Sequence, residues 1–517
     1  MLLTLITFIP LFGALVILAA PKSYIESVKW TALAASAASL ALCIPLMIVF
    51  PYGEPGFHLA PRLISWIPAL GIDYRIGVDG LSLILVVLTA LLSSLSILAS
   101  FSGIQTHQKE FYFFMLILET GMLGTFVALD MFLFFLFWEL MLVPMYFIIG
   151  VWGGRQRIYA SIKFFLYTAF GSALMLLVIF YLYFQAADAM GGVMSFNIEN
   201  FITLELDPSK QYWLFFAFIL AFLIKMPVFP LHTWLPYAHT EAPTAGSVIL
   251  AGVLLKTGVY GFLRFAVPIF PAAAVAFTPW LMLLALIGIV YGAMLAMVQH
   301  DVKRLVAYSS VSHMGLLLAG ILSWNAQGLQ GGIIQMINHG LSTGALFLIV
   351  GMVYERRHTR EIDQFGGLAK VMPVYAAFFM IFMLSSIGLP GLNGFVGELL
   401  VLIGLMRVSL VWTCIAATGV VLGAAYMLWL YQRMMFGPIK LEANQILRDI
   451  TRREILVLLP LALLCFAIGF YPAPLQATIE PPVQNIIQAV QPYLPDASPW
   501  YELPEIQVDQ SGAAGLE

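Results

Sequence analysis

Six ionisable side chains lie in the middle of long apolar stretches of this 517-residue chain. They are Glu139, Lys225, Lys256, His313, His339 and Glu398. At 1.5 Å per residue along a helix, five of the six lie within a few ångströms of the midpoint of their stretch. Carboxylates, amines and imidazoles take up and release protons, and such residues inside a membrane mark ion pathways and proton relays. The residue types and their shared depth therefore predict a proton relay.

A purely structural polar network is the alternative interpretation of these residues. A single charged side chain in a membrane span can extend to the interface or form half of an ion pair. Each charge at the bilayer centre costs about 2.5–3.5 kcal/mol. Together the six would cost on the order of 10–20 kcal/mol before pairing, which is comparable with the stability of a whole domain. A cost of this size favours a function.

The chemistry of the relay residues predicts how they pair. Desolvation and a nearby carboxylate act in opposite directions on the proton affinity of a lysine. Glu139 next to Lys225 would hold that lysine protonated, and a change in the influence of the glutamate would release the proton. The two imidazoles exchange protons near neutral pH and suit steps between Lys256 and Glu398.

Four further residues are weaker candidates for the relay, namely Glu119, Lys163, His232 and His239. Glu119 either tunes the carboxylates or caps an interface. Lys163, near the cytoplasmic start of its span, either extends to the interface or joins the relay. The two histidines, in FPLHTWLPYAHTEAP, either line a path for protons or cap irregular backbone. Asp130 is predicted to be a helix boundary.

The composition determines the class of protein that positions these residues. Hydrophobic residues make up 61% of the chain and charged residues only 10%, with a mean hydropathy of +0.95. Soluble domains carry about 25% charged residues. This excludes soluble, disordered and coiled-coil proteins, and the net charge of −3 gives no indication of nucleic-acid binding. The chain is predicted to be an all-α polytopic membrane protein.

Cysteine usage predicts no cofactor-binding or metal site on this chain. Cys43, Cys414 and Cys465 lie far apart within apolar stretches, and the sequence has no CxxC pair or Cys/His cluster. An iron–sulfur centre and a structural zinc site are therefore not expected. The sequence also has no glycine-rich nucleotide motif after a strand-like run.

Apolar runs separated by charges, Pro or Gly predict about fourteen transmembrane helices. Their approximate bounds are 3–20, 28–50, 80–101, 110–129, 131–151, 159–185, 212–237, 243–266, 277–299, 304–323, 329–354, 372–408, 409–436 and 454–472. The connection 51–79 is expected to be an ordered surface loop. Residues after Pro472 form a Pro-rich acidic tail.

The seventh and twelfth spans are predicted to be interrupted. The seventh contains three prolines, and the twelfth contains the run GLPG at 388–391. Such a break survives in a bilayer only where protein or a water-filled cavity satisfies the freed backbone groups. Matching interruptions in two inverted halves point to a transport site. We therefore predict an N-terminal three-helix segment, two inverted five-helix repeats, and helix 14 with its tail, at 1–109, 110–266, 277–436 and 437–517.

Basic residues in the loops predict the orientation in the membrane. Sixteen of the 24 Lys and Arg residues lie in loops after odd-numbered spans, and five lie in loops after even-numbered spans. Cytoplasmic loops carry an excess of Lys and Arg, so the odd-numbered loops are expected in the cytoplasm or matrix, with both termini on the opposite side. The three remaining lysines, Lys163, Lys225 and Lys256, lie within spans.

Four stretches of the sequence resemble a known family. They are FLFWELMLVPMYFIIGVWGG, FLIKMPVFPLHTWLPYAHTEAPTAGSVILAGVLLKTGVYGFLRF, VKRLVAYSSVSHMGL and GLPGLNGFVGE. They are similar to the antiporter-like membrane subunits of respiratory complex I (NADH:quinone oxidoreductase), of the NuoM or mitochondrial NADH dehydrogenase subunit 4 type. The similarity covers about residues 1–475. It implies fourteen helices with two inverted five-helix repeats and interrupted helices 7 and 12.

The resemblance also implies roles for individual residues. Glu139 matches the family's glutamate on helix 5, Lys225 its lysine on interrupted helix 7, and Lys256 its lysine on helix 8. The two histidines match central positions of the polar axis. Glu398 matches NuoM-like members, because NuoL-like and NuoN-like members resemble one another in having lysine there.

At the level of the whole protein, the resemblance implies a proton-translocating subunit without a redox centre. NADH, FMN, iron–sulfur clusters and quinone would be bound by partner subunits, and NuoL-like and NuoN-like subunits would be its neighbours. The expected location is the bacterial cytoplasmic (inner) membrane or an equivalent energy-coupling membrane.

Two other functions remain open at this point. A subunit of an Mrp-type cation/proton antiporter or of a membrane-bound hydrogenase would share this fold. A haem-bearing electron carrier with His313 and His339 as axial ligands is the second, but it leaves the lysines and glutamates without a role.

Overall fold

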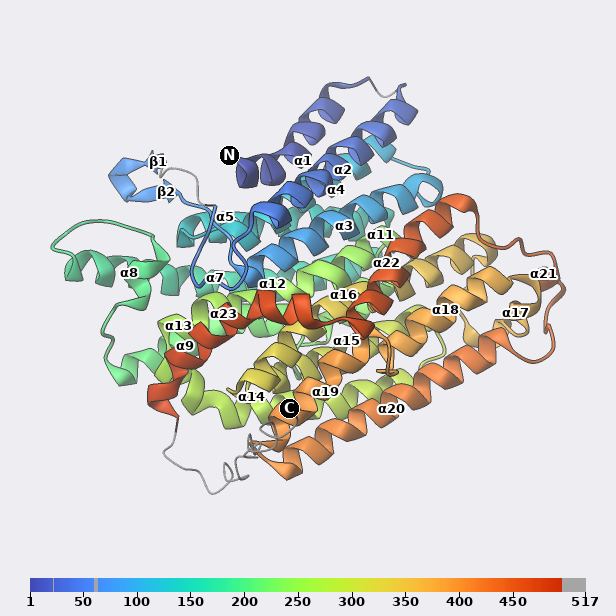
Figure 1. The fold of residues 1–517 in the computed structure, drawn as a ribbon. Coiled ribbons are helices and arrows are strands. Elements are labelled where there is room, and N and C mark those ends of the chain that lie inside the picture. Colours follow the sequence, from blue (N-terminus) through green and yellow to red (C-terminus); the bar gives the residue numbers. More distant parts are fainter. Residues whose placement is uncertain (22, 60–63, 495–517) are drawn as a thin grey trace, which may run out of the picture.

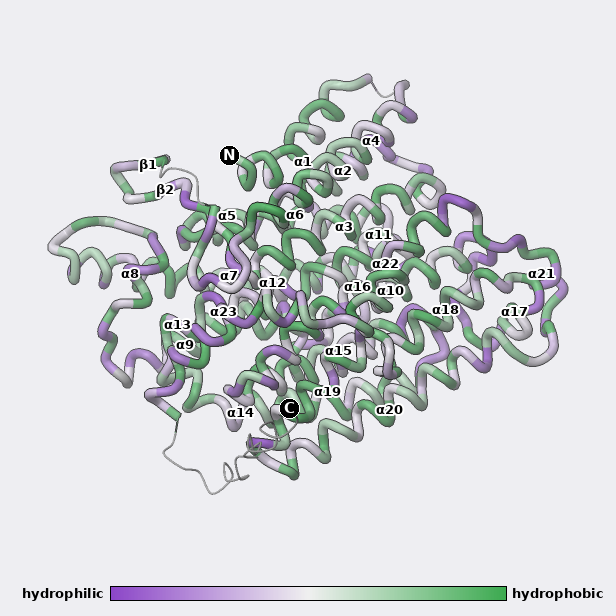
Figure 2. The backbone as a smooth tube through the Cα atoms, viewed as in Figure 1, coloured by the Kyte–Doolittle hydropathy of each residue, from purple (hydrophilic) through white to green (hydrophobic). Residues whose placement is uncertain are grey.

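The computed structural model describes residues 1–21, 23–59 and 64–494, which form a bundle of long, mostly apolar helices (Figures 1 and 2). Within this described part, eleven helices are long and apolar enough to cross a membrane. The prediction of an all-α polytopic membrane protein is therefore confirmed. The number of spans, the inverted repeats and the domain boundaries stay predictions.

The first half of the chain supplies the helices that carry Glu139 and Lys225. Its helices are α1 (Leu2–Ala19), α2 (Ile25–Val49), α3 (Gly80–Gly103), α4 (Gln108–Val127), α5 (Met131–Leu140), α6 (Leu142–Trp152), α7 (Arg157–Ala189), α8 (Ile198–Ile202), α9 (Pro208–Lys225) and α10 (Trp234–Glu241). Asp130 caps α5, because its Oδ1 accepts hydrogen bonds from the backbone N–H groups of Phe132 and Leu133 at 3.0 Å. The predicted helix boundary at Asp130 is confirmed.

The second half supplies the helices that carry the two histidines and Glu398. Its helices are α11 (Thr244–Ile249), α12 (Leu255–Gly261), α13 (Val267–Ile269), α14 (Pro271–Met297), α15 (Val302–Ile321), α16 (Ala326–Arg357), α17 (Leu368–Val371), α18 (Pro373–Ser386), α19 (Asn393–Met406), α20 (Leu410–Met435), α21 (Glu442–Gln445), α22 (Arg452–Phe470) and α23 (Ala473–Val490). Three short 3₁₀ turns lie at Pro68–Leu70, Ile362–Gln364 and Gln491–Tyr493.

Two pairs of helices are separated by short non-helical segments at the sites of the expected interruptions. Residues 226–233 separate α9 from α10, and residues 387–392 separate α18 from α19. Both breaks leave backbone groups that other residues satisfy, as a low-dielectric surrounding requires. The indole N–H of Trp234 donates to the carbonyl of Ile224 at 2.9 Å, and the Asn338 amide donates to the carbonyl of Asn393 at 2.6 Å.

Residues 244–269 form one helical rod with two π-helical stretches, which the sequence did not indicate. The stretches are η2 (Leu250–Leu254) and η3 (Phe262–Ala266), and they flank α12. Glycine lets this rod approach its neighbours closely. A Cβ at Gly261 would lie only 2.2 Å from the ring of Phe222 in α9.

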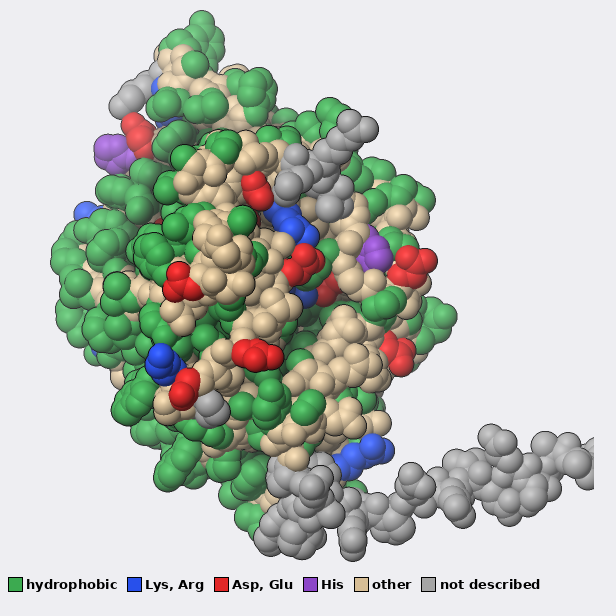
Figure 3. Space-filling view, turned by 90° about the vertical axis from the view of Figure 1, so that its left-hand side faces the viewer, with side chains coloured by type: hydrophobic (Ala, Val, Ile, Leu, Met, Phe, Trp, Pro, Cys, Tyr) green, Lys and Arg blue, Asp and Glu red, His purple; other side chains and the backbone are tan. Residues whose placement is uncertain are grey.

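The connection 51–79 contains a small hairpin that was not expected. Strand β1 (Ile64–Ile67) pairs antiparallel with β2 (Ile72–Tyr74), with Ile64 opposite Tyr74. The hairpin and α8 lie at one end of the bundle, called here the hairpin end, while α17 and α21 lie at the other, called the basic end (Figure 1). Figure 3 looks onto the hairpin end, where the coloured charged side chains are mostly Asp and Glu.

Beyond Pro472, where composition indicates only a Pro-rich acidic tail, the chain forms the amphipathic helix α23. Its apolar face, with Ile479, Val483 and Val490, is buried against the bundle. The helix contacts α3, α13 and α16. The rest of the predicted acidic tail, residues 495–517, lies outside the described residues.

Candidate proton-transfer site

The interruption after α9 brings Glu139 and Lys225 into one region. Lys225 is the last residue of α9 and is 2% exposed, with its ammonium group 4.9 Å from the ring centroid of Trp138 and 5.9 Å from that of Phe164. Glu139, next to Trp138 on α5, is the carboxylate that acts electrostatically on Lys225. Its Oε1 is buried without a hydrogen-bond partner. The two charges therefore lie near each other in an aromatic setting, without a direct hydrogen bond in the described part of the chain.

Lys225 also packs against the helix that carries Lys256. A Cβ at Gly258 of α12 would lie 2.9 Å from the Cβ of Lys225. Gly258 follows Lys256 by two residues, so the backbones that carry the two lysines are close. The side chain of Lys256 is fully buried.

The interruption between α18 and α19 borders a second, more closely connected group. The ammonium of Lys256 lies 2.7 Å from Nδ1 of His339, and it also donates to the carbonyl of Ala251 in η2. The rings of His339 and His313 have centroids 5.8 Å apart. Nδ1 of His313 lies 3.9 Å from Oε1 of Glu398. Helices α12, α16, α15 and α19 thus bring these four predicted residues into one line.

Two residues at the break, Gly388 and Ser386, adjoin Glu398 and His313. Gly388 has φ +71, a conformation that favours glycine, and a Cβ there would lie 2.2 Å from Oε2 of Glu398. Ser386, at the end of α18, has its hydroxyl 3.4 Å from Nε2 of His313. Both ring nitrogens of His313 therefore face polar groups.

Lys163 and His232 form a small group of their own. The ammonium of Lys163 lies 4.5 Å from the ring centroid of Tyr237 and acts electrostatically on His232. His232 is 4% exposed and stacks on Phe229, with Nδ1 buried and unpartnered. Among the described residues, no hydrogen bond joins this group to Lys225.

His239 lies between the basic end and the four-residue line. It is fully buried and stacks on Phe347 of α16, with 4.6 Å between centroids and both ring nitrogens unpartnered. Two lysines act on it electrostatically, Lys256 on one side and Lys303 on the other. A buried imidazole with two free nitrogens can take a proton at one nitrogen and release one at the other.

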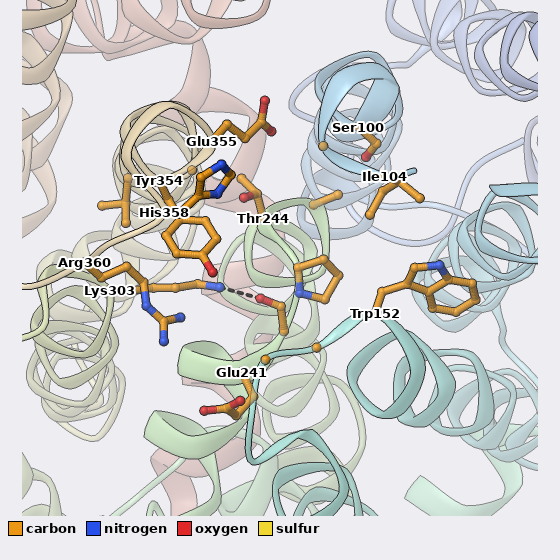
Figure 4. A pocket seen from close by; sticks show the side chains of 18 of the residues that line it. Ser100, Ile104, Trp152, Glu241, Thr244, Lys303, Tyr354, Glu355, His358 and Arg360 are labelled. Carbon is orange, nitrogen blue, oxygen red and sulfur yellow. Dashed lines mark hydrogen bonds between the residues drawn. The ribbon is translucent and has the colours of Figure 1, made fainter. Parts of the chain in front are cut away.

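A cavity of about 920 Å³ opens at the basic end and reaches Lys303 (Figure 4). Glu241, Glu355 and Arg360 are among its lining residues, and Lys303 donates to the carbonyl of Ala242. Lys303 was assigned from the sequence to a surface loop, but it is only 6% exposed. Lys303 lies two residues after Asp301, which caps α15 and accepts a hydrogen bond from the backbone N–H of Lys303 at 2.8 Å.

Glu119 lies elsewhere in the molecule. It is fully buried on α4 and contacts Ser36 of α2. No described hydrogen bond or ion pair joins it to the relay residues. Metal binding has no candidate group either, because no cluster of three or more His, Cys, Asp or Glu side chains that could hold an ion occurs among the described residues.

Comparison with known families identifies the kind of protein. The family described as NADH:quinone oxidoreductase/Mrp antiporter, TM, matches residues 128–423. The family described as NADH-ubiquinone oxidoreductase chain 4, amino terminus, matches residues 5–125. The chain belongs to the antiporter-like membrane subunits of NADH:quinone oxidoreductase. The predicted family is therefore confirmed.

Individual members of this family resemble the chain over nearly its whole length. NADH-quinone oxidoreductase subunit M of Rhodobacter capsulatus is 44% identical over 498 residues, covering 94% of this chain and 96% of that protein. NADH-ubiquinone oxidoreductase chain 4 of Chondrus crispus is 42% identical, covering 91% of this chain and 94% of that protein.

A solved structure supports the same assignment. A chain of respiratory complex I from Thermus thermophilus with bound NADH matches with a TM-score of 0.85 and 31% identity, covering 95% of this chain and 100% of that one. Subunit M and chain 4 of complex I are therefore the members that this chain resembles in sequence, and complex I provides the matching fold.

Proposed function

We propose that this chain translocates protons across an energy-coupling membrane as a membrane-arm subunit of NADH:quinone oxidoreductase. The proposed relay residues are Glu139, Lys225, Lys256, His339, His313 and Glu398. The observation that carries the proposal is the line of four buried ionisable groups from Lys256 to Glu398, which begins on a rod with two π-helical stretches and ends beside a helix interruption. π-helical turns and broken helices both concentrate at functional sites.

The line provides a sequence of proton transfers between neighbouring groups. A protonated Lys256 donates to Nδ1 of His339 across 2.7 Å. Once Nδ1 carries that proton, the proton on Nε2 of His339 can leave toward His313, because this nitrogen has no hydrogen-bond partner among the described residues. His313 then passes a proton to Glu398, whose Oε1 lies 3.9 Å from Nδ1. That last gap is longer than a hydrogen bond, so a water or a small side-chain movement completes it.

Lys225 and Glu139 supply the proton to this line in the proposal. The two groups lie close enough to interact electrostatically, yet they do not share a hydrogen bond in the described residues. A small movement of Glu139 therefore changes the electrostatic stabilisation of the Lys225 ammonium without breaking a hydrogen bond. In this proposal, water joins Lys225 to Lys256, which lie on closely packed helices.

Protons are taken up from the cavity at the basic end. Lys303 borders the cavity, and His239 lies between it and Lys256. Lys163 and His232 provide a second approach to the region of Lys225 in this proposal. The loop charges favour the cytoplasm or matrix at this end, with both termini on the opposite side.

The redox chemistry belongs to other subunits in this proposal. The chain carries no cofactor, and its partners bind NADH, FMN, iron–sulfur clusters and quinone. Its neighbours in the bacterial cytoplasmic membrane, or an equivalent membrane, are NuoL-like and NuoN-like subunits. An Mrp-type antiporter subunit remains the second candidate, because the matching family description includes Mrp antiporters. Purification from its own membrane decides between them: flavin and iron–sulfur subunits co-purify if the first is correct, and do not if the second is.

The proposed role of Lys225 is tested by Lys225→Ala in the assembled complex. Proton uptake into sealed vesicles is measured with a pH-sensitive dye during turnover. We expect pumping to fall by about a hundredfold or more, as for loss of a positioned acid–base group, while the subunit stays in the membrane. Lys210→Ala, on the exposed start of the same helix α9, is the matched control and leaves pumping unchanged. Undiminished pumping by the Lys225 variant would reject the proposal.

A further inference from the structure

Glu119 is a buried carboxyl group that the relay described above does not use. It is fully buried on α4, at the packing of α4 against α2 and α3. Its Oε1 lies 3.0 Å from the hydroxyl of Ser36 on α2, and that hydroxyl lies 3.0 Å from the hydroxyl of Ser94 on α3. The Ser94 hydroxyl lies 2.9 Å from the carbonyl of Ala90. Three helices thus contribute to one row of oxygen atoms.

The number of hydrogen atoms in this row indicates the protonation state of Glu119. The row contains three hydrogen bonds, and each needs one proton. Ser36 and Ser94 carry one hydroxyl proton each, and the Ala90 carbonyl can only accept. Two hydroxyl protons serve two of the three contacts, and a proton on the carboxyl group would serve the third. With a protonated carboxyl group, Ser94 donates to Ala90, Ser36 donates to Ser94, and Glu119 donates to Ser36. With a carboxylate, Ser36 instead donates to Oε1 of Glu119.

The surroundings of the carboxyl group agree with the protonated state. In the described part of the chain, no Lys, Arg or His nitrogen lies within 4.0 Å of it. Its second oxygen, Oε2, is buried without a hydrogen-bond partner. Leaving a carbonyl oxygen unpaired costs a few kcal/mol at most, whereas an unpaired buried carboxylate costs far more. The buried thiol of Cys43 on α2 interacts electrostatically with Glu119, and a protonated thiol is neutral.

We propose that Glu119 is a neutral carboxylic acid that acts as an additional proton-transfer site, with Ser36 and Ser94 as its hydroxyl relay. The site lies among α2, α3 and α4, apart from the line of Lys256 to Glu398. Helix α3 connects the two regions, because it contacts α2 and α4 as well as η2 and α16. The transfer role rests on the proposed function, whereas the protonation state does not.

Release of the proton reverses the direction of the hydrogen bonds in the row. The Glu119 proton moves to Ser36, the Ser36 proton moves to Ser94, and the proton of Ser94 leaves for a water molecule. Ser94 then donates to Ser36, and Ser36 donates to the carboxylate. One proton has left, the carboxyl group is negative, and each hydroxyl points toward that charge. The same row therefore suits both protonation states, which a proton-transfer site requires.

The first test measures the protonation state in the assembled complex by infrared spectroscopy. A neutral carboxylic acid has a carbonyl stretching band separate from that of a carboxylate. We expect one such band to disappear in Glu119→Gln, and to persist in Glu480→Gln, which changes an exposed acid on α23. Identical bands in the wild type and Glu119→Gln would overturn the assignment.

The second test measures protons pumped per NADH oxidised in sealed vesicles. Glutamine keeps the shape of the side chain and can donate to Ser36, but it cannot release a proton. We expect Glu119→Gln to lower pumping by about tenfold. Wild-type pumping in this variant would mean that Glu119 serves only in helix packing, and would overturn its role in proton transfer. If the variant does not assemble, Ser94→Ala decides, since it removes the outlet hydroxyl and is expected to lower pumping by about the same factor.

The Lys225→Ala variant separates failure of this inference from failure of the proposed function. If Lys225→Ala stops pumping and Glu119→Gln does not, only the role of Glu119 is wrong. If neither variant changes pumping, the chain does not translocate protons as proposed.

Discussion

Helices α9 and α18 end alike, but the charged residues at their interruptions lie in different surroundings. In each case the residue after the helix donates its N–H to the carbonyl four positions earlier, and the residue two further on donates to the carbonyl five positions earlier at 3.1 Å. The second pair is Val228 to Leu223 after α9 and Leu389 to Leu384 after α18. The backbone breaks are therefore locally similar.

The side chains at the two breaks differ. Lys225 precedes its break, and the rings of Trp138 and Phe164 lie around its ammonium. Glu398 follows its break and faces His313, with Gly388 close to its carboxyl group. Aromatic rings stabilise a cation without offering a proton acceptor, whereas imidazole exchanges protons directly. We propose that the first break controls when a proton is released and that the second passes it on.

Filling the space at the second break tests its half of the comparison and carries the largest expected effect. In Gly388→Ala the new Cβ meets Glu398 and sits at φ +71. We expect a loss of about 1–2 kcal/mol of stability from the left-handed backbone, plus the smaller cost of moving the carboxyl group of Glu398 away from the new Cβ. Thermal unfolding of the purified complex, followed for this subunit, provides the measurement.

Gly437→Ala is the matched control for that variant. Gly437 has φ +84, but nothing lies within 4 Å of a Cβ there. It should therefore show only the backbone cost of about 1–2 kcal/mol. Equal losses in the two variants would mean that the contact with Glu398 contributes nothing, and the second break would not be fitted to its carboxyl group.

Changing the aromatic ring of Trp138 beside Lys225 tests the surroundings of the first break, and its expected effect is smaller. Trp138→Phe keeps an aromatic ring but weakens the attraction of the cation by about 0.5–1 kcal/mol. We expect the pumping rate to change by about two- to fivefold, because this energy sets the balance between held and released protons. Initial rates of dye quenching in vesicles measure it.

Trp324→Phe controls for the loss of an indole hydrogen bond. Trp138 donates to Ser172 at 2.9 Å and Trp324 donates to Thr278 at 2.7 Å, but no described cation lies over the ring of Trp324. A similar change of pumping in both variants would show that the cation contact at Trp138 is not what matters.

Much of the fold and of the site could be predicted from the sequence, because a bilayer imposes strong rules on it. Long apolar runs predicted most helix positions, and Pro and Gly predicted where α9 and α18 end. Depth along a helix is readable from residue number, so Lys256 and His339 could be selected as candidates. The contact between Lys256 and His339 could not be predicted, because it depends on how two helices far apart in the sequence pack together.

Other features left no readable signal in the sequence. The π-helical stretches around Lys256 have the same composition as an ordinary apolar helix. Helix α23 contains Pro481 and Pro482, and its composition therefore indicated a non-helical tail. Lys303 was missed because burial at a helix start depends on the loops that cover it. The hydroxyl row at Glu119 was not predicted. Ser36 and Ser94 are small residues on separate helices, and the packing of these helices could not be derived from the sequence.

The central claim is that a continuous polar path joins the ionisable residues at mid-membrane depth. A high-resolution map of the assembled complex, with ordered water resolved, tests it most directly. The account predicts water molecules between Lys225 and Lys256, and between His313 and Glu398, each within hydrogen-bond distance of its neighbours. A dry gap filled by apolar side chains at the first of these positions would contradict it.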